Sequence, residues 1–187
     1  LLSREVVDER RFVDLFAGPG MARVRTTSTI IDGSPLIAAK HATAPFSKLI
    51  FVDLARENCD ALEKRLKVAG RPGQIIHGDC NDKIQKVIDT IPPHGLNIAL
   101  IDPYGLRPLS FETLRRLAAV KRMDLVIHFP TMDIKRNFAT AGEYITRFLG
   151  TKKWQDTIKE ARHVVELIDV LREQLSTFGY EQERVRS

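Results

Sequence analysis

Four aspartates, each at the end of a short apolar run, are the residues of this sequence with the clearest chemical potential: Asp14, Asp53, Asp79 and Asp102. Each one alone is equally typical of a helix cap or a turn. Carboxylates that converge on a partly buried crevice repel one another unless a ligand supplies positive charge or hydroxyl donors. As a set, the aspartates therefore predict a site for a ligand that is not dominated by phosphate.

The residues that follow the first of these aspartates form a glycine-rich turn, DLFAGPG at residues 14–20. Two glycines let a backbone pass close to a ligand. A dinucleotide fingerprint requires a third glycine three positions after Gly20, but Arg23 stands there. An NAD-dependent oxidoreductase is therefore only a third hypothesis. S-adenosylmethionine fits the acids better, because it brings a sulfonium, an ammonium, ribose hydroxyls and an adenine amino group.

The elements that position these residues alternate between strands and helices. Apolar or β-branched runs predict five strands, at 12–16, 49–54, 74–77, 97–102 and 124–129. Helix signals between and after them predict helices capped by Ser34, over 56–70, over 82–91, from Ser110 to 122, and a longer one after Trp154. This order is typical of an α/β fold with a doubly wound, mainly parallel sheet, which binds ligands beyond the carboxyl ends of its strands.

Composition limits the classes of protein to consider. With 187 residues, 43% of them hydrophobic, the chain suits one domain over 1–187, with a motif-bearing core at 11–130 and a helical part at 138–187. Its first and last residues predict a fragment, with structure missing at the C-terminus. No run suits a membrane span or a signal peptide, so we expect a cytoplasmic protein without membrane partners. The net charge of +5 favours polyanionic partners such as nucleic acid, but the excess is mild, and on charge alone the scattered basic residues fit solvated helix faces better.

The segments DLFAGPG, FVDL, GDCND and IDPYG resemble, in order, the first four motifs of class I S-adenosylmethionine-dependent methyltransferases. DLFAGPG followed by DGSPLIAAKHA, KLIFVDL and IDPYGL is similar to the three-Cys-motif partner (TcmP) family, over residues 11–130. The resemblance implies a Rossmann-like class I methyltransferase fold, S-adenosylmethionine as cofactor, and a three-Cys-motif protein as a partner.

The resemblance also implies cofactor-binding residues. Asp14, Phe16, Gly18 and Gly20 would surround the methionine moiety. Asp53 would take the ribose hydroxyls with Leu54 beside it, while Asp79 would face the adenine amino group and Cys80 would offer its backbone. Neither Cys59 nor Cys80 has the spacing of a disulfide framework or a zinc site, and no metal is expected.

The fourth motif bears on the reaction. Asp102, Pro103 and Tyr104 are the predicted catalytic residues, because an acid or carbonyl can accept from an exocyclic amine while an aromatic ring stacks on its base. The form Asp-Pro-Tyr-Gly is similar to that of tRNA guanine-N2 dimethyltransferases, and the base itself is left open. A rim containing Arg107 and the segment 128–137, with His128, Asp133, Lys135 and Arg136, is a candidate substrate contact. These features predict a methyltransferase acting on an exocyclic nitrogen of a nucleic-acid base; the alternative is a non-catalytic partner protein that keeps the fold.

Overall fold

The computed structural model describes residues 9–24, 26–159 and 161–180, which form two compact units. The first unit contains the chain up to Asp102 together with Val120–Ile127, and the second contains Pro103–Ala119 and the chain from His128 onward. That the whole chain acts as one domain stays a prediction.

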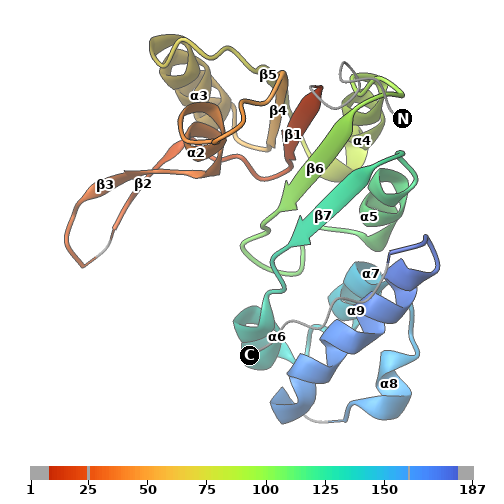
Figure 1. The fold of residues 1–187 in the computed structure, drawn as a ribbon. Coiled ribbons are helices and arrows are strands. Elements are labelled where there is room, and N and C mark those ends of the chain that lie inside the picture. The colour runs from red at the N-terminus through yellow and green to blue at the C-terminus, as the bar shows by residue number, and fades with distance from the viewer. Residues whose placement is uncertain (1–8, 25, 160, 181–187) are drawn as a thin grey trace. The chain divides into compact units, whose positions relative to one another are not determined.

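A parallel five-stranded sheet forms the centre of the first unit (Figure 1). Its strands lie in the order β5-β4-β1-β6-β7. Their bounds are β1 (Arg10–Asp14), β4 (Lys48–Asp53), β5 (Gln74–His77), β6 (Leu96–Ile101) and β7 (Met123–Ile127). Counted along the parallel strands alone, this order is 3-2-1-4-5, with β1 paired to β4 on one side and β6 on the other. The prediction of a doubly wound, Rossmann-like α/β fold is confirmed.

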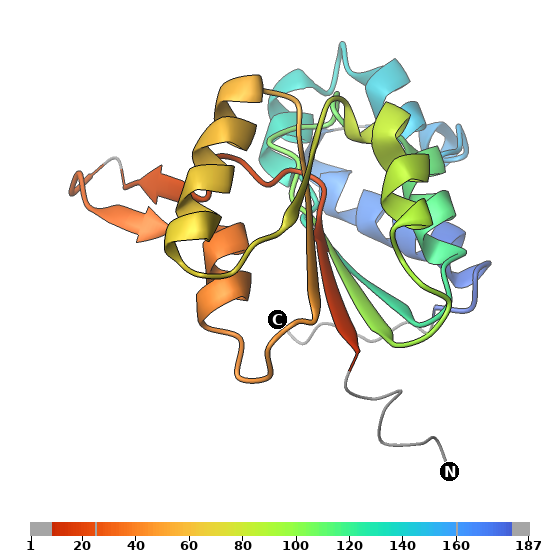
Figure 2. The ribbon, with the colours of Figure 1, turned by 90° about the horizontal axis from the view of Figure 1, so that it is seen from above.

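Helices cover both faces of this sheet in the first unit. Figure 2 shows α2 (Ser34–Lys40) and α3 (Arg56–Val68) on one side and α4 (Cys80–Asp89) on the other. Phe12 and Phe51 of the strands form one core cluster with Leu36 and Leu62 of the helices. On α4, Ile84 and Val87 are fully buried. A sheet covered on both faces explains why the strands read as nearly continuous apolar runs.

A short antiparallel hairpin interrupts the alternation. It consists of β2 (Met21–Arg23) and β3 (Ile30–Asp32), and it leads directly into α2. The sequence analysis did not predict this hairpin. It also placed Ser34 at the N-cap of α2, which is wrong, because Gly33 is the N-cap and Ser34 is the first helical residue. The hydroxyl of Ser34 is instead directed to Asp14.

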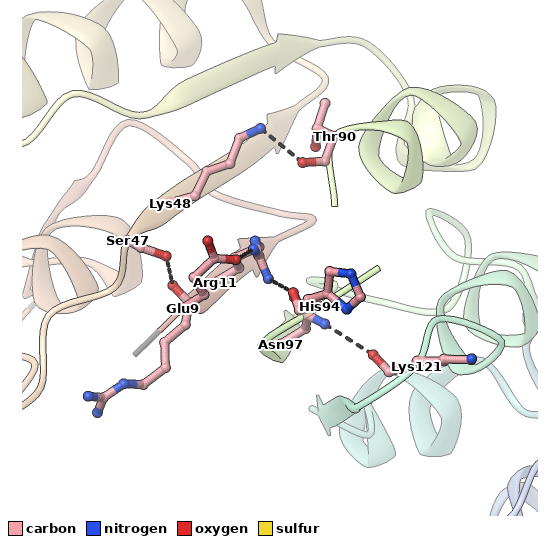
Figure 3. Close-up of polar contacts among 9 residues, drawn as sticks. Glu9, Arg11, Ser47, Lys48, Thr90, His94, Asn97 and Lys121 are labelled. Atoms are coloured by element: carbon pink, nitrogen blue, oxygen red, sulfur yellow. Dashed lines mark hydrogen bonds and ion pairs between the residues drawn. The ribbon is translucent and has the colours of Figure 1, made fainter. Parts of the chain in front are cut away.

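The edge of the sheet at which the strands begin is closed by polar contacts (Figure 3). Arg11 is only 3% exposed, donates to the carbonyl of His94 and pairs with Glu9. Asn97 Nδ2 donates to the carbonyl of Lys121 over 3.1 Å. These bonds satisfy donors that would otherwise be costly to bury. The predicted site residues Asp14, Asp53 and Asp102 lie at the other end of the strands.

The second unit is helical. It contains α5 (Phe111–Ala118), α6 (Thr131–Asn137), α7 (Gly142–Leu149), α8 (Trp154–Thr157), the 3-10 helix η1 (Ala161–Glu166) and α9 (Leu167–Ser176). Ile145 and Phe148 of α7 are fully buried, and Phe148 meets Phe129 edge to face, with ring centroids 5.5 Å apart. Trp154 Nε1 donates to Thr146 Oγ1 over 3.0 Å.

Some helix boundaries differ from the predictions. The longer helix predicted to follow the Trp154 region is present as η1 and α9, and Val164, Leu167 and Leu171 of its apolar stripe are buried. Its first part is a 3-10 helix and not an α-helix, and the extended, buried Ile158 separates it from α8. Helix α5 ends at Ala118 because Arg122, with φ +54, turns the chain into β7. No helix in the described part of the chain is long and apolar enough to cross a membrane.

Candidate functional site

Asp14 lies at the carboxyl end of β1, and its side chain is completely buried. One carboxylate oxygen, Oδ1, accepts from the backbone N–H of Phe16 over 3.0 Å, and Oδ2 accepts from Ser34 Oγ over 2.6 Å. Burial raises the pKa of Asp14 to about 6 against the lowering effect of these two bonds, and the charges of Asp102 and Asp53 raise it further. Three of the four predicted acids therefore lie close enough to interact electrically.

The glycine turn continues from β1 between the neighbouring strands. Ala17 N–H donates to the carbonyl of Val52 over 3.0 Å. Gly18 and Gly20 both have left-handed backbone angles, with φ of +59 and +81. A β-carbon on Gly20 would come within 2.8 Å of Leu62 Cδ1, whereas nothing lies within 4 Å of the corresponding position on Gly18. The turn thus requires glycine at both positions, and beside Gly18 it faces open space.

Asp53 ties this turn to the next strand. Its Oδ2 accepts from the backbone N–H of Gly18 over 2.7 Å, and its Oδ1 accepts from Ala55 N–H over 2.8 Å and from Asn58 Nδ2 over 3.0 Å. A carboxylate offers about four acceptor positions. Asp53 therefore holds three protein donors and keeps one position for a ligand. The side chain of Leu54, the next residue, is 67% exposed.

Asp79 occupies the N-cap of α4. Its Oδ1 accepts from the backbone N–H of Asn81 over 2.8 Å and from Asn81 Nδ2 over 2.7 Å. Cys80 is the first residue of the helix and is buried, as is Cys59. Helix capping, the ordinary structural role of an N-terminal Asp, is thus observed here. The contact of Asp79 and Cys80 with an adenine ring stays a prediction.

The predicted catalytic residues Asp102, Pro103 and Tyr104 are divided between the two units. Asp102 is exposed and ends the first segment of unit one, while Pro103 and Tyr104 begin unit two. Tyr104 is 89% exposed, which is unusual for so large an aromatic ring. The assignment of these three residues to catalysis stays a prediction.

A cavity of about 220 Å³ lies within the second unit. Its lining includes Tyr104, Arg107, Asp133, Asn137 and Tyr144. The Arg107 guanidinium carbon lies 4.7 Å from the centroid of the Tyr144 ring. Arg107 and the segment 128–137, which contains Asp133 and Asn137, were predicted substrate contacts, whereas Tyr144 was not predicted, because no motif or spacing joins α7 to the Asp-Pro-Tyr-Gly segment.

Not every residue of the predicted rim belongs to this cavity. Lys135 and Arg136 are exposed on α6 and are not among its lining residues, and His128 is exposed at the start of the same segment. Among residues 9–24, 26–159 and 161–180, no cluster of three histidine, cysteine or acidic side chains has the arrangement of a metal site.

Comparison with solved structures found two chains of similar structure. No family model matches the chain, and no curated protein matches it, so membership of the TcmP family stays a prediction. The chain is similar to the crystal structure of an S-adenosylmethionine-dependent methyltransferase from Clostridium acetobutylicum ATCC 824, at 17% identity and a TM-score of 0.35 over 63% of this chain. The matched region is 39% of that methyltransferase, so the chain spans about two fifths of its length. The fold class assigned above rests on the strand order and not on this similarity.

Proposed function

We propose that the chain is an S-adenosylmethionine-dependent methyltransferase that acts on an exocyclic nitrogen of a nucleic-acid base. The observation that carries this proposal is that Asp53 holds Gly18 of the left-handed glycine turn, while the charges of Asp102 and Asp53 raise the pKa of the buried Asp14 before that turn. Burying one carboxylate near two others is unfavourable in the free protein. A cationic ligand relieves that repulsion, and a ligand with several phosphates would increase it.

The residues of the first unit fit this cofactor. Open space beside Gly18 leaves room for a ligand against the turn, and the remaining acceptor position of Asp53 suits a ribose hydroxyl. Exposed Leu54 could cover one face of an adenine ring. The cofactor supplies an activated methyl group. Asp14 holds the turn in place through Phe16 and provides negative charge beneath it.

Asp102 and Tyr104 would handle the acceptor. Both residues are exposed. The carboxylate of Asp102 can accept a hydrogen bond from an amine, and the ring of Tyr104 can stack on a base. Methyl transfer depends mainly on alignment of the two reacting atoms, so few residues need to change protonation. The positive net charge of the chain supports a nucleic acid as acceptor.

The first experiment is calorimetric titration of the full chain with S-adenosylmethionine and with S-adenosylhomocysteine. We expect one binding site for each compound. Asp53→Asn should weaken binding at least tenfold, since hydrogen bonds to a charged acceptor contribute about 1.5–3 kcal/mol. Asp60→Asn, which neutralises an exposed acid on α3, is the matched control and should bind normally. Absence of binding by the folded wild-type protein would remove the proposal.

The second experiment separates a methyltransferase from a non-catalytic partner. The protein is incubated with a labelled methyl donor and either RNA or DNA, and the methylated base is identified by mass spectrometry. Asp102→Ala should abolish methyl transfer, and it should weaken cofactor binding less than Asp53→Asn does, because Asp102 acts on the cofactor only through its charge. Cofactor binding without transfer to any nucleic acid would favour the non-catalytic alternative.

A further inference from the structure

We infer that the cavity of the second unit is a binding site for a guanine base of single-stranded nucleic acid. This inference rests on the proposed function and specifies its substrate. The cavity is bounded by the segment Tyr104–Pro108 and by residues of α6, α7 and the turn between them. Its volume of about 220 Å³ suits one heterocyclic base, with the sugar and phosphate left outside. All of its lining residues belong to the same unit.

Three of the side chains that line the cavity carry planar groups, those of Tyr104, Arg107 and Tyr144. The Arg107 guanidinium is stacked on the ring of Tyr144, with 4.7 Å from its carbon to the ring centroid. Tyr104 provides a second aromatic ring, and this residue is 89% exposed. Aromatic rings and arginine planes are the surfaces on which unpaired bases stack. These three side chains favour a planar ligand over an aliphatic one.

Asp133 supplies an acceptor that is fixed in place. Its Oδ2 accepts from the backbone N–H of Leu106 over 3.0 Å, and its Oδ1 accepts from Asn137 Nδ2 over 2.9 Å. Gly105 permits this position, because a β-carbon there would lie 2.8 Å from Asp133 Oδ2. With one protein donor on each oxygen, the carboxylate keeps an acceptor position on both. It is therefore prepared to receive two adjacent N–H groups.

Guanine is the natural base with that pattern. Its N1–H and its N2 amine are neighbouring donors, whereas adenine and cytosine place a ring acceptor beside their amine, and uracil has a single ring N–H between two carbonyls. A bare acceptor facing a carboxylate is repelled. An arginine side chain has similar donors, but the Arg107 cation already stacked on Tyr144 opposes a second cation.

Positively charged side chains lie on a helix that lines the cavity, as expected for a site that binds nucleic acid. Lys135 and Arg136 are exposed on α6, the helix that also carries Asp133 and Asn137. Phosphates attached to a bound base would remain in solvent, where such side chains can pair with them. Asp133 would then contribute to binding by recognising the base, and the basic side chains of α6 would contribute separately by attracting the phosphate backbone of the nucleic acid.

The test uses fluorescence anisotropy with the full chain and labelled oligouridine that carries one central variable base, without any methyl donor. We expect guanine at that position to bind about tenfold more tightly than adenine, cytosine or uracil. Hypoxanthine, which has N1–H but no N2 amine, should lie between guanine and the others. This comparison requires no mutation, so it does not depend on how any variant folds.

Variants then locate the site. Asp133→Asn should remove the preference for guanine, and Asp156→Asn, a matched exposed acid on α8, should retain it. Tyr144→Leu should weaken all oligonucleotides alike and leave the order of preference unchanged. Equal binding of all bases, no binding, or an undiminished guanine preference in folded Asp133→Asn would each overturn the inference. Since no cofactor is present, these failures are distinguishable from a failure to bind S-adenosylmethionine.

Discussion

Replacing Asp14 by Asn should make the protein more stable at neutral pH and less able to bind its cofactor. The carboxyl group is fully buried, and its pKa rises from 3.8 to about 6. Folding therefore favours the protonated form, so the native state binds more protons than the unfolded state between these values. Stability then falls as the pH rises through this window. A shift of about 2 pKa units corresponds to about 3 kcal/mol above pH 6.

Asn imitates the neutral acid in size and keeps an oxygen for the Phe16 N–H, while its amide can donate to Ser34. We expect Asp14→Asn to raise the free energy of unfolding by up to about 3 kcal/mol at about pH 7.5 and to change it little near pH 4. Urea unfolding followed by far-ultraviolet circular dichroism measures this difference in the free energy of unfolding. For the control Asp60→Asn, the difference from the wild type should not change with pH. A difference for Asp14→Asn that did not grow with pH would refute the reasoning.

Other substitutions test the turn and the core. Gly20→Ala should destabilise the protein more than Gly18→Ala, because both residues are left-handed but only Gly20 would also contact Leu62; we expect about 2–4 kcal/mol against about 1 kcal/mol in urea unfolding. Ile84→Ala, which removes a fully buried side chain of α4, should cost about 2–5 kcal/mol by the same assay. Arg115→Ala should change stability by less than about 0.5 kcal/mol, because its bond to a neighbouring glutamate lies on the solvent side of α5.

The centre of the sheet could be predicted because β1 and β4 are buried at nearly every position. Buried strands read as unbroken apolar runs, and β5 was predicted to the residue. The hairpin of β2 and β3 escaped prediction for the opposite reason. Its strands are short, and Ile30 and Ile31 are 60% and 48% exposed, so burial imposes no alternation on them. Nothing in the pattern of residues 21–32 therefore distinguishes a ribbon from a loop.

The site was predictable to the extent that topology brings strand ends together. Asp14, Asp53 and Asp102 follow adjacent strands, so their grouping follows from the strand order alone. The cap formed by Asp79 was one of two roles that the sequence allowed, and only the bonds to Asn81 show that capping is in use. Tyr144 could not be found in this way, since its approach to Arg107 depends on how α7 packs within the second unit.

Asp53 shows why a single substitution rarely isolates a binding role. The same carboxylate holds Gly18 of the turn, the start of α3 through Ala55, and the side chain of Asn58. Its loss would loosen the turn as well as remove a ligand contact, so weakened cofactor binding has two possible causes. Asn58→Ala removes one protein donor and leaves the carboxylate intact, which frees an acceptor position. If Asp53 binds ribose directly, Asn58→Ala should preserve or strengthen cofactor binding, whereas a purely structural Asp53 predicts that both variants weaken it.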